Sequence, residues 1–177
     1  MFERDPLANP EPLIRRVYAY VAYRIGDGPD AEDVTSATFE RALRYRKSFD
    51  PRRGEPLVWL IGIARGCLAE AREGGAVPVA DLPEVPDPGD QEDTALRRLW
   101  LAAAVAHLEE RDRELIALRY GADLTARQIA DLLDLRTNAV EVALHRALAR
   151  LRAELEAPAD KPAPAGRPCP RPETPDD

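Results

Sequence analysis

Apolar residues recur every third or fourth position through most of the chain, which is the spacing of one face of an α-helix. The first such stripe consists of Leu13, Val17, Val21 and Ile25, with Ile14 and Tyr18 beside them. Asn9 suits the cap of this helix, Pro10 its first position and Gly26 its end. The pattern therefore predicts a helix over residues 10–25.

Two further helices follow in the first half of the chain. One is expected over about residues 31–46, with Asp30 as its cap, and the other over 56–73, ended by Gly74 and Gly75. The residues expected to face the core are Val34, Thr38, Phe39, Ala42 and Leu43 on the first, and Leu57, Leu60, Ile61, Ala64 and Leu68 on the second. The segment FDPRRGEP between them is typical of a turn.

The second half of the chain predicts four helices that include a helix-turn-helix. Apolar spacing predicts the first two over residues 96–108 and 110–120. A capping box of Thr125 and Gln128 fixes the start of the third, and residues 134–136 form a short break before the last. The inward positions are Ile129, Leu132 and Leu133, then Val140, Leu144, Leu148 and Leu151. Two helices joined by so short a break are typical of a helix-turn-helix.

Prolines separate these helical segments into two domains. Four of the 17 prolines lie in the middle of the chain and seven near its C-terminus, where helix interiors are excluded. We therefore expect an all-α protein of two small helical domains, residues 1–73 and 95–157, the second containing the helix-turn-helix. An acidic flexible linker, residues 74–94, joins them, and a disordered Pro-rich tail, residues 158–177, follows.

The net charge of −7 belongs to the linker and the tail. Each domain carries as many basic as acidic groups, whereas the linker carries six acids and no base. The acidic total is therefore no argument against a nucleic-acid partner for the domains. At 177 residues and 45% hydrophobic composition, the chain is large enough to bury real cores.

Several classes of protein are excluded by what the sequence lacks. Its two cysteines, Cys67 and Cys169, are far apart and its two histidines form no metal-binding motif, so no disulfide framework, metal site or cofactor is expected. No phosphate-binding glycine loop or catalytic motif occurs, so we expect no enzyme and assign no catalytic residue. The longest membrane-like stretch, Pro56–Ala64, is too short to span a bilayer, and no signal peptide is visible, which predicts a cytoplasmic protein without membrane insertion.

Two segments of the first domain carry opposite charge. Residues 41–53 concentrate Arg41, Arg44, Arg46, Lys47, Arg52 and Arg53 against Asp50 alone. Clustered cations beside aromatic side chains suit phosphate neutralisation and stacking of unpaired bases. The alternative is a solvated helix end with the aromatic rings in the core. Residues 27–34 instead gather four acids at a helix start, where they either stabilise the helix dipole or form a docking surface for a basic partner.

The last helix presents side chains that can read DNA. Its outward groups are Arg136, Thr137, Asn138, Glu141, Val142 and His145, and Arg146, Arg150 and Arg152 extend a basic flank. Amide and carboxylate groups can hydrogen-bond base edges, and arginine binds phosphate or guanine. For His145 an ordinary exposed surface position is the alternative.

These motifs, taken in order and with their linker, resemble the two-domain form of the bacterial extracytoplasmic-function (ECF) sigma factors over residues 10–155. DAEDVTSATFERAL resembles the segment that binds the polymerase clamp, and FDPRRGEPLVWLIGIAR the segment that melts and reads the minus-ten element. The helix-turn-helix resembles the region that reads the minus-thirty-five element. The resemblance implies a specificity subunit that binds core RNA polymerase, directs it to promoter DNA and helps to open the duplex, while polymerase makes the bonds.

The resemblance also implies roles for particular residues. Core polymerase binding would fall to Asp30, Glu32, Asp33, Phe39 and Arg41, and the minus-ten strand to Arg52, Arg53, Trp59 and Arg65. Minus-thirty-five DNA would be read by Arg136, Thr137, Asn138, Glu141, Val142, His145 and Arg146. The acidic linker corresponds to the segment that threads the polymerase cleft. An anti-sigma partner, the promoter sequence and the inducing signal stay open.

Departures from the family pattern fall on each of these surfaces. The clamp segment has Ser36-Ala37 where the family usually has Gln-Glu. The minus-ten segment has Gly66 in place of the common Asn, and the acids Glu70 and Glu73 in place of the usual basic residues. The recognition helix has Glu141-Val142-Ala143 in place of the usual Lys-Ser-Arg. Asp134 replaces the usual Gly of the turn, and Asp tolerates left-handed geometry. Because a carboxylate accepts from cytosine N4 and Val contacts a thymine methyl, we expect an altered promoter sequence. The alternatives are a stand-alone helix-turn-helix transcriptional regulator and a helical interaction adaptor without DNA contacts.

Overall fold

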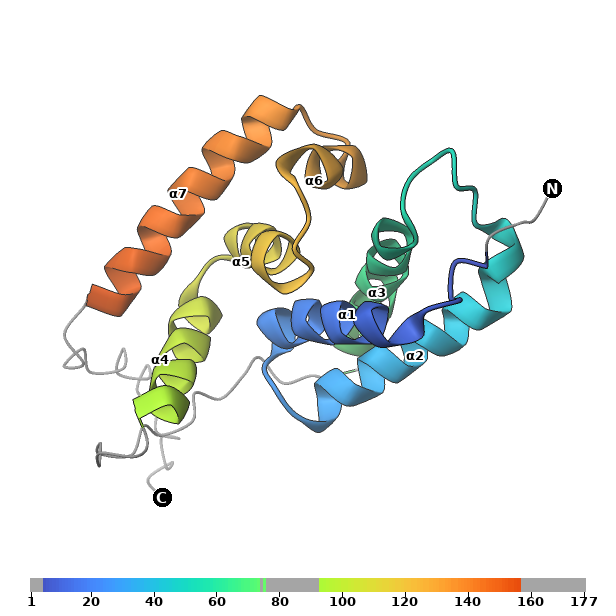
Figure 1. Ribbon diagram of the computed structural model, residues 1–177. Helices are drawn as coiled ribbons and strands as arrows, with labels where there is room; N and C mark the ends of the chain where they lie inside the picture. The colour runs from blue at the N-terminus through green and yellow to red at the C-terminus, as the bar shows by residue number, and fades with distance from the viewer. Residues whose placement is uncertain (1–4, 74, 76–92, 157–177) are drawn as a thin grey trace, which may run out of the picture.

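A computed structural model of the protein describes residues 5–73, 75 and 93–156, with the backbone alone for 93–99. Within these residues every regular element is helical, which confirms the all-α prediction (Figure 1). The elements are α1 (Pro10–Ile25), α2 (Pro29–Tyr45), the 3-10 helix η1 (Arg46–Ser48), α3 (Pro56–Glu73), α4 (Asp93–His107), α5 (Glu110–Ile116), the π-helical η2 (Ala117–Gly121), α6 (Ala126–Leu133) and α7 (Thr137–Glu156). The predicted tail and nearly all of the predicted linker lie outside the described residues.

The first domain consists of α1, α2 and α3, which pack against one another around a buried apolar centre. Its fully buried side chains include Val17 and Val21 of α1, Ala42 of α2, and Leu60 and Ile61 of α3. The bounds of α1 and α3 agree with the prediction. Each begins at a proline, which lacks only an N–H that would have no helical partner at that position.

Two predictions for α2 are wrong. Leu43, expected in the core, is 57% exposed, because its neighbour Ala42 takes the fully buried position on the helix. Asp30 does not cap the helix, since Gly28 holds the N-cap position and Pro29 begins the helix. Asp30 therefore lies in the first turn, where its carboxylate still favours the positive end of the helix dipole.

The second domain contains α4 to α7, and α6 and α7 form the predicted helix-turn-helix. Thr125 caps α6 as predicted: its hydroxyl accepts the Gln128 N–H (3.2 Å), and the Gln128 side chain accepts the Thr125 N–H (2.9 Å). Asp134 ends α6 in the left-handed region with a φ of 54°, a geometry that Asp tolerates. The inward residues Val140, Leu144 and Leu151 are buried, and Leu132, Leu133 and Leu148 are half-buried.

The helix predicted over residues 110–120 changes its type before its end. It is α-helical to Ile116 and then widens into η2, which ends at Gly121. The Ala122 N–H accordingly bonds the carbonyl of Ala117, five residues back (2.9 Å). Such wide turns are rare and often lie at functional positions. Here η2 is the part of the second domain that packs most extensively against α1, beside smaller contacts from α4 and α5.

The two domains share one continuous hydrophobic core, which the sequence analysis did not predict. Val17 and Tyr20 of α1 belong to the same buried cluster as Leu118 and Leu124 of the second domain. In Figure 1, α1 lies against α5 and the turn that follows it, and α3 lies near α6. We refer to this packing of one domain on the other as the closed arrangement.

Two smaller observations complete the fold. Cys67 is buried in α3, whereas Cys169 lies outside the described residues. Each helix in the described part of the chain is too short or too polar to cross a membrane.

Candidate nucleic-acid interface

The residues predicted to read minus-thirty-five DNA lie together at the start of α7. Arg136 immediately precedes the helix, and its carbonyl accepts the N–H groups of Ala139 and Val140 (2.9 and 3.1 Å). The exposed members of the group are Arg136, Asn138, Glu141, Val142, His145 and Arg146, and Thr137 is half-buried. We call this set the recognition face. Because residues three and four apart lie on one side of a helix, Asn138, Glu141, Val142 and His145 form one solvent-facing patch, with the other members of the set around it.

The recognition face is held by the packing on the other side of α7. Val140 is fully buried and Leu144 is 8% exposed, and both belong to the shared core. The capping box of Thr125 fixes the start of α6, against which α7 packs. On the outer side, Val142 is 51% exposed, so its methyl groups are available to an apolar partner. The helix-turn-helix therefore presents a rigid surface that combines cations, an amide, a carboxylate and an apolar side chain.

Arg52 and Arg53 lie on an exposed turn between η1 and α3. Asp50 forms this turn, because its carboxylate accepts the Arg52 N–H (3.0 Å) and its carbonyl accepts the Arg53 N–H (3.0 Å). The carboxylate of Asp50, the one acid of the basic segment, thus accepts a backbone N–H. Both guanidinium groups extend toward solvent, where they can neutralise phosphates.

Trp59 was predicted either to lie in the core or to stack on an unpaired base, and the structure shows an intermediate position. It is half-buried in α3 and packs against the Phe49 ring, with the ring centroids 5.5 Å apart and tilted by 57°. A tilted contact of this kind fixes the indole ring at the edge of the core. Part of the ring stays accessible beside the turn of Arg52 and Arg53.

Arg65, the fourth residue predicted for the minus-ten strand, faces the second domain. Its Nε donates to Oε1 of Glu114 in α5 at 3.0 Å, and its side chain is 39% exposed. The structure therefore does not bring Arg65 together with Arg52 and Arg53 in one open surface. In the closed arrangement the carboxylate of Glu114 occupies the Nε of Arg65.

The residues predicted to bind polymerase lie along α2. Asp30, Glu32 and Asp33 are exposed in its first turns, and Phe39 is half-buried. Arg41 instead turns toward α3, where both of its terminal nitrogens donate to the carboxylate of Glu70 (2.7 and 2.6 Å). These hydrogen bonds hold the pKa of Glu70 below its ordinary value and raise the pKa of Arg41. Glu70, one of the acids that depart from the family pattern, thus has a partner in the neighbouring helix.

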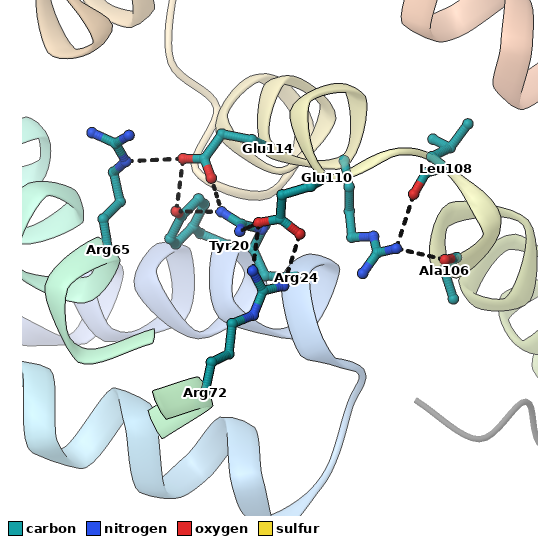
Figure 2. Close-up of polar contacts among 9 residues, drawn as sticks. Tyr20, Arg24, Arg65, Arg72, Ala106, Leu108, Glu110 and Glu114 are labelled. Atoms are coloured by element: carbon teal, nitrogen blue, oxygen red, sulfur yellow. Dashed lines mark hydrogen bonds and ion pairs between the residues drawn. The ribbon is translucent and has the colours of Figure 1, made fainter. Parts of the chain in front are cut away.

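A cluster of charged residues between the domains was missed by the sequence analysis. Figure 2 shows Arg24 of α1 between the carboxylates of Glu110 and Glu114, to both of which it is paired. Arg72 of α3 donates to both oxygens of Glu110 (2.7 and 2.8 Å), and the Tyr20 hydroxyl donates to Glu114 (3.1 Å). The sequence signal that could have indicated this cluster is the spacing: Tyr20 and Arg24 are four residues apart, as are Glu110 and Glu114, so each pair lies on one side of its helix.

Burial and hydrogen bonding shift the pKa values of several residues in this cluster and beside it. The pKa of Tyr20 is raised because its phenol is buried away from water. The hydrogen bonds from Arg72, helped by the charge of Arg24, lower the pKa of Glu110 despite its partial desolvation, and the same bonds raise the pKa of Arg72. Burial lowers the pKa of the neighbouring Arg113, which donates to the carbonyls of Ala106 and Leu108.

Family models of sigma factors match both domains. Residues 11–73 match the model of Sigma-70 region 2, and residues 98–151 match that of Sigma-70, region 4. The ECF RNA polymerase sigma factor ShbA of Streptomyces griseus is 42% identical over 131 residues, which cover 69% of this chain and 68% of ShbA. The ECF sigma factor SigD of Mycobacterium tuberculosis is 32% identical over 169 residues, covering 84% of this chain and 74% of SigD. BldN of Streptomyces coelicolor is 30% identical over 148 residues, covering 76% of this chain but only 54% of BldN.

Solved structures agree with this assignment at the level of the fold. The structure of CnrH in complex with the cytosolic domain of CnrY matches with a TM-score of 0.58 and 25% identity, over 85% of this chain and 83% of that one. The sigma factor RpoE of Bartonella quintana, solved with the anti-sigma factor NepR, matches with a TM-score of 0.61 and 20% identity, over 84% of this chain and 94% of that one. A capped helix-turn-helix follows a three-helix domain in this chain, both domains match sigma-70 models, and ShbA is similar over most of its length. The chain therefore belongs to the ECF RNA polymerase sigma factors.

Proposed function

We propose that this chain binds core RNA polymerase through its first domain, directs the enzyme to promoters through both domains, and helps to open the duplex at the minus-ten element. The observation that carries the proposal is the recognition face, a solvent-facing patch of DNA-reading side chains on the second helix of a capped helix-turn-helix. A helix placed in this way is the element that enters the major groove in proteins of this type.

The chemistry of the recognition face defines what it would read. The Glu141 carboxylate would accept from cytosine N4, and Val142, 51% exposed, would contact a thymine methyl group. Arg136 and Arg146 lie on either side of them in sequence and would bind phosphate or guanine. We therefore expect a minus-thirty-five sequence that differs from those read by relatives with Lys-Ser-Arg at these positions.

The minus-ten strand would be held by the exposed turn of the first domain. Arg52 and Arg53 would neutralise its phosphates, and the accessible part of Trp59 would contact an unstacked base beside them. Arg65 would join these residues once it separates from Glu114. Single-stranded DNA suits this surface because bases that are no longer paired can reach an aromatic side chain.

The exposed side of α2 would form the polymerase contact. Asp30, Glu32 and Asp33 supply negative charge at one end of the helix. Leu43, 57% exposed, lies four residues after Phe39 and supplies an apolar contact nearer the other end. The exposure of Leu43, which contradicts a core role, is thus consistent with a docking surface. An anti-sigma factor, such as the NepR solved with RpoE, would compete with polymerase or DNA for surfaces of this chain.

Bond formation during transcription would belong to the polymerase, and this chain would act as an initiation factor without a catalytic residue of its own. A factor that works on polymerase and promoter DNA in bacteria would act in the cytoplasm.

The deciding experiment is co-elution of the purified chain with core RNA polymerase over a series of salt concentrations. We expect a stoichiometric complex at moderate salt, followed by selection of a promoter with that holoenzyme in run-off transcription. A folded chain that forms no complex at low salt would contradict the proposal. Specific duplex binding by the free chain would then support the alternative of a stand-alone helix-turn-helix regulator.

A further inference from the structure

The contact between the domains uses one stripe of α1. Arg16, Tyr20 and Arg24 are four residues apart on that helix, and all three contact the second domain. Arg24 is only 5% exposed although it is charged. A buried arginine without acidic partners would be strongly unfavourable, so the stripe is suited to a closed interface.

Both carboxylates that compensate Arg24 come from the other domain. Glu110 and Glu114 lie one helical turn apart on α5, and each pairs with Arg24 and with one arginine of α3, Arg72 or Arg65. Glu114 is 15% exposed, and it accepts from the Tyr20 hydroxyl as well. Separation of the domains would leave three guanidinium groups on the first domain without these carboxylates.

Arg16 makes a second kind of contact between the domains. Its Nε donates to the carbonyl of Ala122 (2.9 Å) and its terminal nitrogen to the carbonyl of Asp123 (2.8 Å). These carbonyls follow the end of η2, where helical hydrogen bonding stops and backbone acceptors lack partners. A cation at this end also favours the negative pole of the helix dipole.

Gly121 allows the backbones themselves to come close. A Cβ atom at this position would lie 2.8 Å from Cα and 2.9 Å from N of Tyr20, distances that real Cβ contacts do not reach. The φ of Gly121 is not in the left-handed region, so the backbone of the second domain does not itself require glycine here. The absence of a side chain at Gly121 is therefore explained by the closed arrangement.

We propose that these contacts form an interdomain latch. In it, α5 and the end of η2 pair with the arginines of the first domain that face them, Arg16, Arg24, Arg65 and Arg72, and Glu114 takes the place of a DNA phosphate on Arg65. The proposal rests on the proposed function in one respect, the role of Arg65 at the minus-ten strand. Glu114 accepts from the Nε of Arg65 (3.0 Å), and a carboxylate and a phosphate are alternative acceptors for the same guanidinium donors, so the two compete for Arg65. DNA binding through Arg65 thus requires the latch to open, and the free chain is held in a state of low DNA affinity.

The arrangement is tested first in the free, full-length chain, without DNA or polymerase. Spin labels at Ser36→Cys and Ala149→Cys, two exposed positions in different domains, report the interdomain distance in a Cys169→Ser background. We expect one narrow, short distance in the parent and a longer, broader distribution in Gly121→Ala. Gly62→Ala is the matched control, because its new methyl group would also face the other domain but meet Leu132 at 3.9 Å, an ordinary contact.

Glu114→Gln keeps the test decisive if Gly121→Ala fails to fold. It removes the charge that faces Arg24 and Arg65 with little change of shape, and we expect it to broaden the distance in the same way. A broad distribution in the parent, or a short distance retained in the folded opening variants, would overturn the latch. Neither result depends on polymerase, so failure of the latch is distinguishable from failure of the proposed function.

Whether the latch lowers the affinity for DNA is tested by measuring the Kd of the free chain for a fluorescent, mixed-sequence single-stranded DNA. Since the apparent Kd rises as the binding-competent fraction falls, we expect the opening variants to bind about tenfold more tightly than the parent. Adding Arg65→Ala to Gly121→Ala should remove that gain. Equal affinity of parent and opening variants would show that the latch does not withhold Arg65 from DNA.

Discussion

Arg41 of α2 and Glu70 of α3 are joined by two hydrogen bonds of 2.7 and 2.6 Å between a guanidinium fork and a carboxylate. The pair links two helices of the first domain at the surface, with the Glu70 side chain 60% exposed. The pair gives a local partner to Glu70, one of the acids that the sequence analysis named as departures from the family pattern. It also engages both terminal nitrogens of Arg41, one of the residues predicted to bind polymerase.

Glu70→Gln is expected to lower the Tm of the chain slightly, because it converts a charged, two-point pair into a neutral contact at an exposed site. Thermal unfolding followed by circular dichroism at low salt measures the effect, which should shrink at high salt. Glu73→Gln, an exposed acid three residues further along α3, is the matched control for the loss of charge. Equal decreases in both variants would mean that the pair with Arg41 contributes nothing specific.

Thr125→Ala is expected to lower the free energy of unfolding of the second domain by about 1 kcal/mol, because the first turn of α6 loses its capping oxygen. Thr125→Ser retains the hydroxyl that accepts the Gln128 N–H and should restore most of the stability. Urea denaturation of the full chain checks both values. An alanine variant as stable as the serine variant would contradict the importance of the capping box.

Acid is expected to weaken the closed arrangement. The hydrogen bonds from Arg72 hold the pKa of Glu110 below 4.5, with further help from the charges of Arg24 and Arg113 and against the effect of desolvation. A carboxyl whose pKa is depressed in the closed arrangement stabilises it fully above its ordinary value, and this stabilisation disappears as the pH falls through the lowered value.

The interdomain distance measured from neutral pH to below 4.5 should therefore lengthen in the parent chain. In Glu110→Gln, which has no such proton to bind, the distance should already be longer at neutral pH and should lose this part of its pH dependence. A parent distance that does not change with acid while the chain remains folded would contradict the contribution of Glu110.

Local chemistry in the sequence predicts most of the helices and the recognition face. Pro10, Pro56 and the Thr125–Gln128 box mark helix starts because each satisfies or avoids an unpaired N–H. Asp134 was expected to adopt left-handed geometry and does so with a φ of 54°. These features depend on neighbours within a few residues, so no knowledge of the tertiary structure was needed.

The closed arrangement could not be predicted in the same way. Arg24 was not assigned to the core because charged residues are rarely buried, and its partner Glu110 is 86 residues away in the sequence. Apolar residues of both domains enter the shared core, but the pattern of their stripes does not identify the partner surface. Leu43 illustrates the reverse case, since helical spacing alone did not separate it from its buried neighbour Ala42.

The double variant Arg52→Ala, Arg53→Ala is expected to impair promoter opening more than polymerase binding, because both side chains lie on an exposed turn away from α2's acidic end. Each lost phosphate contact with a single strand should reduce the slope of log K against log salt by about 0.7. Permanganate footprinting measures opening, and co-elution measures polymerase binding. Arg111→Ala, an exposed arginine on α5, is the control; equal loss of opening and binding in the double variant would refute the role of the turn.

Glu141→Lys is expected to change the minus-thirty-five sequence that the holoenzyme selects. The carboxylate lies exposed on the recognition face, beside Val142, and its replacement by an ammonium group exchanges an acceptor for a donor. At the position where cytosine N4 donates to Glu141, the preference for cytosine should weaken by about 1–3 kcal/mol, and guanine, which presents acceptors, should be favoured instead. Selection from a randomised promoter library checks this, with Glu156→Lys at the far end of α7 as the control for the same change of charge. If Glu141→Lys and Glu156→Lys both select the same sequences as the parent, Glu141 does not read a base, and any altered preference would have to come from other side chains of the recognition face.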